Sequence, residues 1–169
     1  MIWKRLPLDI WSEDLRTEDG KISTLSQLAE RGHPDDLSFL IEVSVATSEP
    51  WIIRAETFRF LLDTDLEDPV LHAQMTVALR SALEREQNIT VQQYAAFCVG
   101  PFLDDEDLRR LVQNLLLVSE DLRWNLMEAI CEEETLSAAV QHMLHDVQEK
   151  TSDQSLRTEI AEVLRQRAS

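Results

Sequence analysis

Residues 121–130, Asp-Leu-Arg-Trp-Asn-Leu-Met-Glu-Ala-Ile, carry the pattern that decides the predicted fold. Apolar side chains recur there at intervals of three and four residues, which is the period of an amphipathic α-helix. One residue departs from this pattern, because Trp124 falls where a polar side chain is expected. The stretch therefore predicts a helix with one large aromatic side chain on its polar side.

The same helical period continues along most of the chain. Glycine, which turn-rich β folds need, occurs only 3 times in 169 residues, and this favours an all-α protein of about nine helices. The first short helix is expected over 22–31, and the fourth is expected to carry Val70 and Val77 among its apolar residues. Residues that cap helices mark the later starts, at Pro34, Ser48, Asp68, Asn88 or Thr90, Asp104, Ser119, Glu134 or Thr135, and Ser152.

Four of these expected helices, the third, fifth, seventh and ninth, share one template. An apolar residue is followed by Arg or Gln, two free positions, two mostly apolar residues, another free position and two apolar residues. The second position holds Arg54, Gln92, Arg123 and Arg157, at separations of 38, 31 and 34 residues. Two helices in a repeating unit of about this length are typical of α-solenoids. An irregular helical bundle is the alternative.

The template resembles HEAT-like (armadillo-like) repeats over residues 34–166, most closely at 119–123 and 152–157, where acidic turns precede Leu-Arg. Gln92 departs from the pattern. The resemblance implies a short solenoid of roughly four helix pairs within a single domain, 1–169. A helix over 21–33 would cap this stack, and a leader over 1–20, with Trp3 and Trp11, would pack on the body.

The recurring arginines are expected to be structural. Arg54, Arg123 and Arg157 lie near the edge of the apolar face. Their aliphatic stems can pack inside while the guanidinium groups bond carboxylates or carbonyl groups of a neighbouring loop.

The free positions of the template form the candidate binding face, which in HEAT-like stacks lines the concave surface. Aromatic side chains at the centre of a patch with charges around them are typical of protein-binding hot spots. The alternative is that the leader or a tight superhelical curvature covers this face. The predicted partner-binding residues are Glu56, Tyr94, Phe97, Trp124, Asn125, Glu128, Glu159 and Glu162.

The formal net charge of −16 disfavours binding to nucleic acid and to anionic membrane surfaces, because both require basic residues. It suits a basic protein partner, although strong negative charge also simply maintains solubility. Residues 101–134 contain ten acidic and three basic side chains, so we expect a basic partner to dock there.

Residues for catalysis or cofactor binding are sparse. His142 and His145 lie three residues apart on an expected helix, but nothing nearby supplies the further ligands that a metal site needs. The acidic runs at 104–107 and 132–134 fall at helix starts, where they favour the helix dipole. We expect no metal, no cofactor and no enzymatic activity. The lack of a signal peptide or a spanning segment predicts a cytoplasmic protein.

These features predict a non-enzymatic, acidic protein-binding module. A concrete version, by analogy of charge and size, is a bacterial immunity-type inhibitor that blocks a basic toxin. The alternatives are a HEAT-like enzyme of the chromophore-lyase type and a structural subunit or adaptor. The sequence leaves open the identity of the partner, the biological pathway and the oligomeric state.

Overall fold

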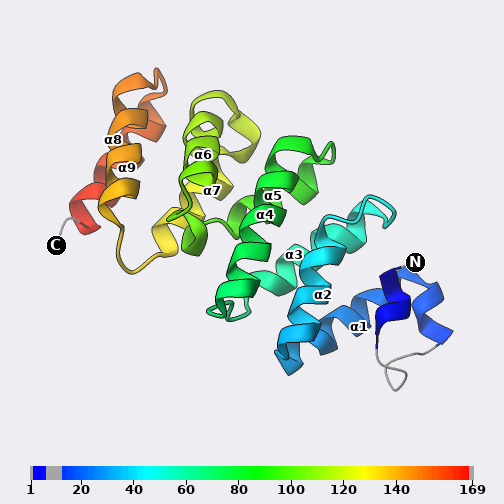
Figure 1. Cartoon of the computed structure of the whole chain (residues 1–169). Helices are drawn as coiled ribbons and strands as arrows, with labels where there is room; N and C mark the ends of the chain where they lie inside the picture. The colour runs from blue at the N-terminus through cyan, green and yellow to red at the C-terminus, as the bar shows by residue number, and fades with distance from the viewer. Residues whose placement is uncertain (1, 7–12, 168–169) are drawn as a thin grey trace. The chain divides into compact units, whose positions relative to one another are not determined.

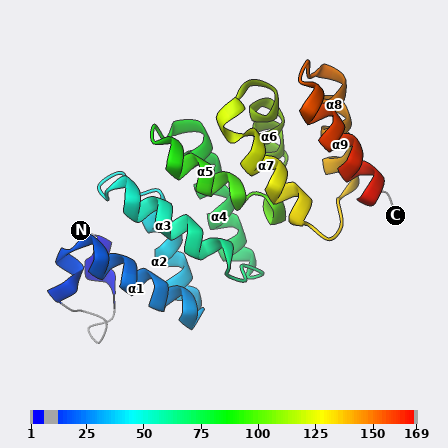
Figure 2. The ribbon, with the colours of Figure 1, turned by 180° about the vertical axis from the view of Figure 1, so that it is seen from behind.

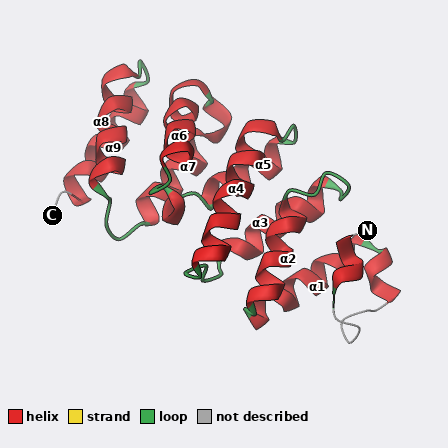
Figure 3. Cartoon of the chain, in the orientation of Figure 1, coloured by secondary structure: helices red, strands yellow, loops and turns green. Residues whose placement is uncertain are grey.

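The computed structural model describes residues 2–6 and 13–167. Every regular element in this part of the chain is a helix, which confirms the all-α prediction (Figure 3). Nine α-helices and three short 3-10 helices follow one another along the described residues. In chain order they are η1 (Ile2–Arg5), η2 (Glu13–Arg16), α1 (Glu18–Arg31), α2 (Pro34–Ser44), α3 (Trp51–Leu62), α4 (Pro69–Arg85), α5 (Ile89–Phe97), η3 (Gly100–Phe102), α6 (Glu106–Val118), α7 (Glu120–Glu132), α8 (Ala138–Lys150) and α9 (Gln154–Arg167).

The chain forms two compact units, unit 1 over residues 1–95 and unit 2 over residues 96–169. In unit 1, α2 packs beside α4, and α1 packs beside α3 on the opposite side (Figures 1 and 2). In unit 2, α6 packs beside α8, and the reverse view brings α7 and α9 forward (Figure 2). Within each unit, therefore, alternate helices of the chain share a layer.

Short polar side chains begin most of the helices, as the sequence predicts. The carboxylate of Asp68 accepts hydrogen bonds from the first amides of α4, at 2.8 Å from the Val70 nitrogen. Asn88, and not Thr90, plays the same part for α5. Asp105 and Asp153 do so for α6 and α9. These caps satisfy amides that have no partner within their own helix.

The first helix is longer than predicted, because Gly20 does not interrupt it. The hydroxyl of Thr17 accepts a hydrogen bond from the Gly20 amide at 3.1 Å, and α1 begins one residue after Thr17. The predicted start at Ile22 is therefore wrong. The predicted end is confirmed, since Gly32 closes the helix in the left-handed conformation that favours glycine.

The eighth helix begins later than predicted. Its cap is Ser137, whose hydroxyl accepts from the Val140 amide at 3.3 Å. The predicted starts at Glu134 and Thr135 fall in the connection before it. A serine three residues downstream is thus the stronger cap here, and the acidic run over 132–134 spans the end of α7 and the turn beyond it.

Trp3 joins the amino-terminal segment to the body of unit 1. Its ring is 3% exposed and meets Phe39 edge-on, with ring centroids 5.4 Å apart. Its indole nitrogen donates a 2.8 Å hydrogen bond to Glu49, whose carboxylate also pairs with Lys21 at 2.6 Å. The tryptophan thus buries its apolar ring while a charged network receives its N–H group. Trp11, which the sequence also predicts to pack, lies outside the described residues.

Each unit has its own apolar core. Fully buried side chains include Leu40, Phe58 and Leu79 in unit 1 and Leu126 and Ile130 in unit 2. Burial of each such side chain stabilises the fold by about 1.5–3 kcal/mol relative to leaving it in water.

Two valines expected among the apolar residues of α4 do not face the core. Val70 is 64% exposed and Val77 is 66% exposed, whereas Leu71 and Ala78 beside them are buried. Helical periodicity places Val70 and Val77 on one stripe but does not determine whether another element covers that stripe.

Gly100 allows the start of η3 to approach the end of α7 closely. A Cβ atom at this position would lie 2.6 Å from the carbonyl oxygen of Ala129 and 2.5 Å from a carboxylate oxygen of Glu133. The glutamate side chain can move away, but the backbone carbonyl of α7 is held by its helix. No side chain larger than hydrogen therefore fits without displacing the backbone.

We expect Gly100→Ala to destabilise unit 2 by about 1–3 kcal/mol, the usual cost of overpacking. Urea denaturation followed by far-UV circular dichroism measures this loss. Ala138→Gly, on the exposed first turn of α8, serves as the control and should cost less than about 1 kcal/mol. Equal stability of Gly100→Ala and the wild type would contradict the close approach.

Candidate functional site

The candidate site is the exposed face of α7 and α9 in unit 2. Leu122, Leu126 and Ile130 turn toward the core of this unit. On the other side of α7, Trp124 is 62% exposed and Glu128, one turn later, is half-buried. The pattern of residues 121–130 therefore places the largest side chain of α7 in solvent.

An aromatic pair lies at the centre of this face. The rings of Trp124 and Phe97 meet edge to face, with centroids 5.5 Å apart and planes at 89°. Phe97 is the last residue of α5 and is itself half-buried. Edge-to-face contact of this kind contributes about 0.5–1.5 kcal/mol beyond area burial. Phe97 thus supports the Trp124 ring from one side while the rest of the indole remains accessible.

Carboxylates of α7 and α9 lie near each other, and one of them, Glu128, is one turn from Trp124. Partial burial, followed by repulsion from Glu128 and Asp153, raises the pKa of Glu159 above its ordinary value. Burial and the carboxylates of Glu159 and Glu128 likewise raise the pKa of the Cys131 thiol. These shifts require Glu128 and Glu159 to lie within electrostatic reach of each other and of Cys131. A positive group bound here would relieve their repulsion.

Glu162 extends the acidic edge of the face by one helical turn beyond Glu159. It is exposed, and it makes surface contacts along its own helix, with Arg165 at 3.7 Å and Gln166 at 3.2 Å. Exposed pairs of this kind contribute little to stability. The Glu162 carboxylate is therefore available to a second protein at small cost.

Asn125 is a correction to the predicted face. The residue is only 6% exposed, although the sequence predicts a partner contact. On a helix of 3.6 residues per turn, Asn125 shares a side with Leu122 and Ala129, and both are buried. Its counterpart in α3, Glu56, is half-buried. The second free position of the template in α7 thus belongs to the packed side.

Two further predicted residues, Glu56 and Tyr94, belong to unit 1. Glu56 is half-buried and pairs with Arg59, at 2.7 Å between carboxylate and guanidinium atoms. Tyr94 is half-buried on α5. The cluster described in unit 2 is therefore made of Phe97, Trp124, Glu128, Glu159 and Glu162. We call these five residues the Trp124 face.

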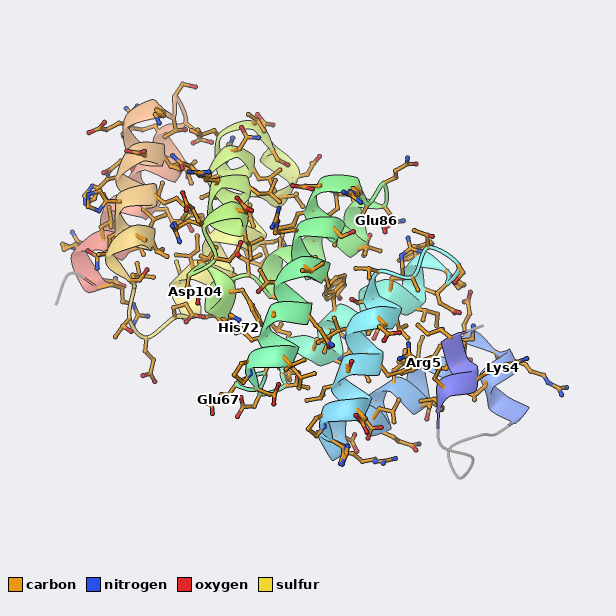
Figure 4. The ribbon with its side chains drawn as sticks, viewed as in Figure 1. Lys4, Arg5, Glu67, His72, Glu86 and Asp104 are labelled. Carbon is orange, nitrogen blue, oxygen red and sulfur yellow. The ribbon has the colours of Figure 1, made fainter. Side chains whose placement is uncertain are left out.

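In each unit, the arginine of the template bonds a backbone carbonyl that precedes its own helix and pairs with a carboxylate. In unit 1, the guanidinium of Arg54 donates to the carbonyl of Glu49 and pairs with Glu86 at 2.9 Å. Glu86 lies directly after α4 (Figure 4). In unit 2, Arg123 donates to the carbonyl of Leu116 at 2.9 Å and pairs with Asp153 at 2.7 Å.

The two remaining template positions make the same kind of contact. Arg157 donates to the carbonyl of Gln148 at 3.3 Å, near the end of α8. Gln92, which departs from the arginine pattern, donates its side-chain amide to the carbonyl of Leu83 at 3.4 Å, near the end of α4. Gln92, Arg123 and Arg157 thus satisfy carbonyl groups in the last turn of the preceding helix, where helices leave such groups without partners. Arg54 instead bonds the Glu49 carbonyl in the connection between α2 and α3.

The Arg54–Glu86 pair makes unit 1 sensitive to acid. Burial alone would raise the pKa of Glu86, but the Asn88 amide and the Arg54 guanidinium together hold it below the ordinary value of 4.5. A carboxyl group whose pKa is lowered by folding stabilises the protein above its unfolded pKa, and this stabilisation disappears as pH falls through the folded pKa.

We therefore expect Glu86→Gln to be less stable than the wild type at pH 7, with a difference that shrinks below about pH 4.5. Denaturant titrations at several pH values between 3 and 7 measure both free energies of unfolding. Glu84→Gln, on the exposed side of α4, is the matched control and should show no such trend. A difference that stays constant over this range would rule out the pair as its source.

The two closely spaced histidines of the sequence lie on α8. His142 and His145 are exposed on α8, and the ring of His142 lies against the carbonyl of Ala138 at 3.1 Å. Over residues 2–6 and 13–167, no three His, Cys, Asp or Glu side chains are arranged to hold a metal ion. Among the described helices, none combines the length and the apolar character that crossing a membrane requires.

One feature of the site was not predicted. Cys131 lies beside the acidic edge of the Trp124 face, and the guanidinium of Arg167 bonds its backbone carbonyl at 3.0 Å. The template placed Cys131 just after the last apolar position of the seventh helix, so no periodic signal marked it.

Comparisons with known proteins identify no relative of this chain. No family model matches the chain, and no curated protein or solved structure matches it either.

Proposed function

We propose that this chain is a non-enzymatic binding module whose Trp124 face holds a basic protein. The observation that carries the proposal is the 62% exposure of Trp124 beside Phe97, with carboxylates of α7 and α9 at its edge. A tryptophan is the side chain most often found at the energetic centre of a protein interface. Leaving one in solvent without a partner offers no gain in stability.

The charge around the aromatic pair defines the partner. Residues 101–134 carry ten acidic and three basic side chains, and Glu159 and Glu162 add to the acidic edge from α9. Partial burial, and then repulsion from Glu128 and Asp153, raises the pKa of Glu159. A lysine or arginine of the partner would relieve this repulsion and could stack on the indole ring.

We further propose that the helices form HEAT-like repeats. This proposal is supported by the contacts of Gln92, Arg123 and Arg157 with the last turn of the preceding helix, and by the contact of Arg54 with the connection that follows the preceding helix. Recurrence of one contact at one template position is what repeated helix pairs require. In such a module the second helices, α7 and α9 among them, supply the binding side chains.

The most concrete version is an immunity-type inhibitor. A basic toxin such as a nuclease would dock its substrate-binding surface on the acidic Trp124 face, which would exclude the substrate. Opposite charge would accelerate association, as it does in other acidic inhibitors of basic enzymes.

The test is co-expression of the chain with the product of the adjacent reading frame, followed by affinity purification of the tagged chain. We expect a basic protein to co-purify in a 1:1 complex whose dissociation constant rises steeply between 50 and 500 mM salt. A partner that binds without salt dependence, or an acidic partner, would contradict the proposed recognition. Capture of the product and loss of its toxicity would support the inhibitor version.

A further inference from the structure

Unit 1 contains two aromatic rings that are each covered by a cation of the same chain. In the first case, the ammonium nitrogen of Lys21 lies 5.1 Å from the centre of the Trp3 ring and 2.6 Å from a carboxylate oxygen of Glu49. A cation in this position is attracted both by the electrons of the ring and by the opposite charge. We call such a set of ring, carboxylate and cation a triad.

The second triad of unit 1 lies on the surface of α3. The guanidinium carbon of Arg59 lies 4.5 Å from the centre of the Phe60 ring, and a guanidinium nitrogen pairs with Glu56 at 2.7 Å. The Arg59 side chain is 44% exposed, whereas that of Lys21 is 18% exposed. The more exposed triad thus uses a guanidinium group. Because this group is planar, it can lie flat on a ring while its edge donates to a carboxylate.

The Trp124 face has two members of such a triad and lacks the third. The Trp124 indole is 62% exposed, and Phe97 contacts it edge to face. Glu128 follows one turn later on the same side of α7, where side chains four residues apart are neighbours. Over residues 2–6 and 13–167, no Lys or Arg covers the Trp124 ring or forms an ion pair with Glu128. Residues 1, 7–12 and 168–169 contain neither Lys nor Arg.

Arginines of α7 and α9 are engaged elsewhere. Arg123 pairs with Asp153 at 2.7 Å, and Arg167 donates to backbone carbonyls at and after the end of α7, at 2.9 and 3.0 Å. The template position that holds Arg59 in α3 holds Glu128 in α7, five residues after the template arginine in both helices. A cation that completes the triad at Trp124 therefore has to come from another molecule.

We propose that an arginine of the basic partner supplies this cation, with its guanidinium group stacked on Trp124 and paired with Glu128. This inference rests on the proposed function, because it names the side chain that the Trp124 face recognises. Arginine suits the site better than lysine, since the Trp124 ring is exposed and a guanidinium group is more weakly hydrated than an ammonium group. Glu159 lies within electrostatic reach of Glu128 and adds to the attraction.

Two peptides of equal charge, Gly-Arg-Gly and Gly-Lys-Gly with both ends blocked, test the choice of side chain. The indole N–H resonances in ¹H–¹⁵N NMR spectra follow each tryptophan separately, and Trp124→Phe identifies the resonance of Trp124. We expect the arginine peptide to shift this resonance with a dissociation constant at least about threefold below that of the lysine peptide. Trp51, 45% exposed in unit 1, should show no such preference.

Glu128→Gln should remove the preference for the arginine peptide, because it removes the charge that the guanidinium group pairs with. Glu149→Gln, exposed on α8, is the matched control and should keep the preference. Equal dissociation constants of the two peptides in the wild type would overturn the arginine contact but leave the Trp124 face as a site for basic groups. A Trp124 resonance that neither peptide shifts would overturn both the contact and the proposed face. A preference that survives in Glu128→Gln, or is lost in Glu149→Gln, would also overturn the contact.

Discussion

Replacement of Trp124 by alanine is expected to weaken binding of the basic partner about 30-fold or more, which corresponds to roughly 2 kcal/mol. The indole is 62% exposed, so its removal exposes little of the core of unit 2. The loss should appear mainly as faster dissociation, because long-range attraction by the acidic residues remains. Surface plasmon resonance with the purified partner measures both rate constants.

Trp51→Ala is the matched control for this experiment. Trp51 is 45% exposed at the start of α3, in unit 1, and carries no proposed contact. Its replacement should change the affinity less than about twofold. If Trp124→Ala binds as tightly as the wild type, or if Trp51→Ala loses as much affinity, the Trp124 face is not the binding site.

Replacement of Arg54 by alanine is expected to have the largest effect on stability, a loss of about 3 kcal/mol from unit 1. The guanidinium is 8% exposed and bonds both the Glu86 carboxylate and the Glu49 carbonyl. The variant leaves that carboxylate in a buried setting without its cation, which costs more than the loss of one exposed ion pair. Guanidinium chloride denaturation gives the difference in free energy.

Arg59→Ala provides the comparison, because Arg59 also pairs with a glutamate of unit 1, but its side chain is 44% exposed. Its replacement should cost less than about 1 kcal/mol. Similar losses in the two variants would show that burial of the Arg54 pair does not determine its contribution.

Local sequence signals predicted the helices well where the determinant lies within a few residues. The carboxylates of Asp68 and Asp153 and the amide of Asn88 begin helices through contacts with amides two or three residues away. Such contacts form whatever the rest of the chain does. The start of α1 was placed too late, at residue 22, although the Gly20 amide is the donor that Thr17 caps.

Sequence periodicity was less informative about which side of a helix is covered. It placed Asn125 with Trp124 on a free face, but neighbouring helices bury Asn125. It counted Val70 and Val77 among the apolar residues of α4, but no described element covers them. Both outcomes depend on where other helices pack, and the period of a single helix does not contain that information.

The candidate site was predictable in part for the same reason. Trp124, Glu128, Glu159 and Glu162 occupy template positions that point away from the core, so the repeat pattern was sufficient to find them. The edge-to-face contact with Phe97 depends on tertiary packing within unit 2, which the period of α7 does not contain. The mutual effect of Glu128 and Glu159 likewise requires α7 and α9 to lie near each other.

Amide hydrogen exchange of the chain with and without its purified basic partner tests the central claim most directly. If the Trp124 face is the binding site, amides of α7 and α9 should exchange more slowly in the complex, by about tenfold or more, while those of α2 and α4 stay unchanged. Trp124→Ala should abolish this protection at the same concentrations. Slower exchange confined to unit 1, with α7 and α9 unaffected in a saturated complex, would contradict the account.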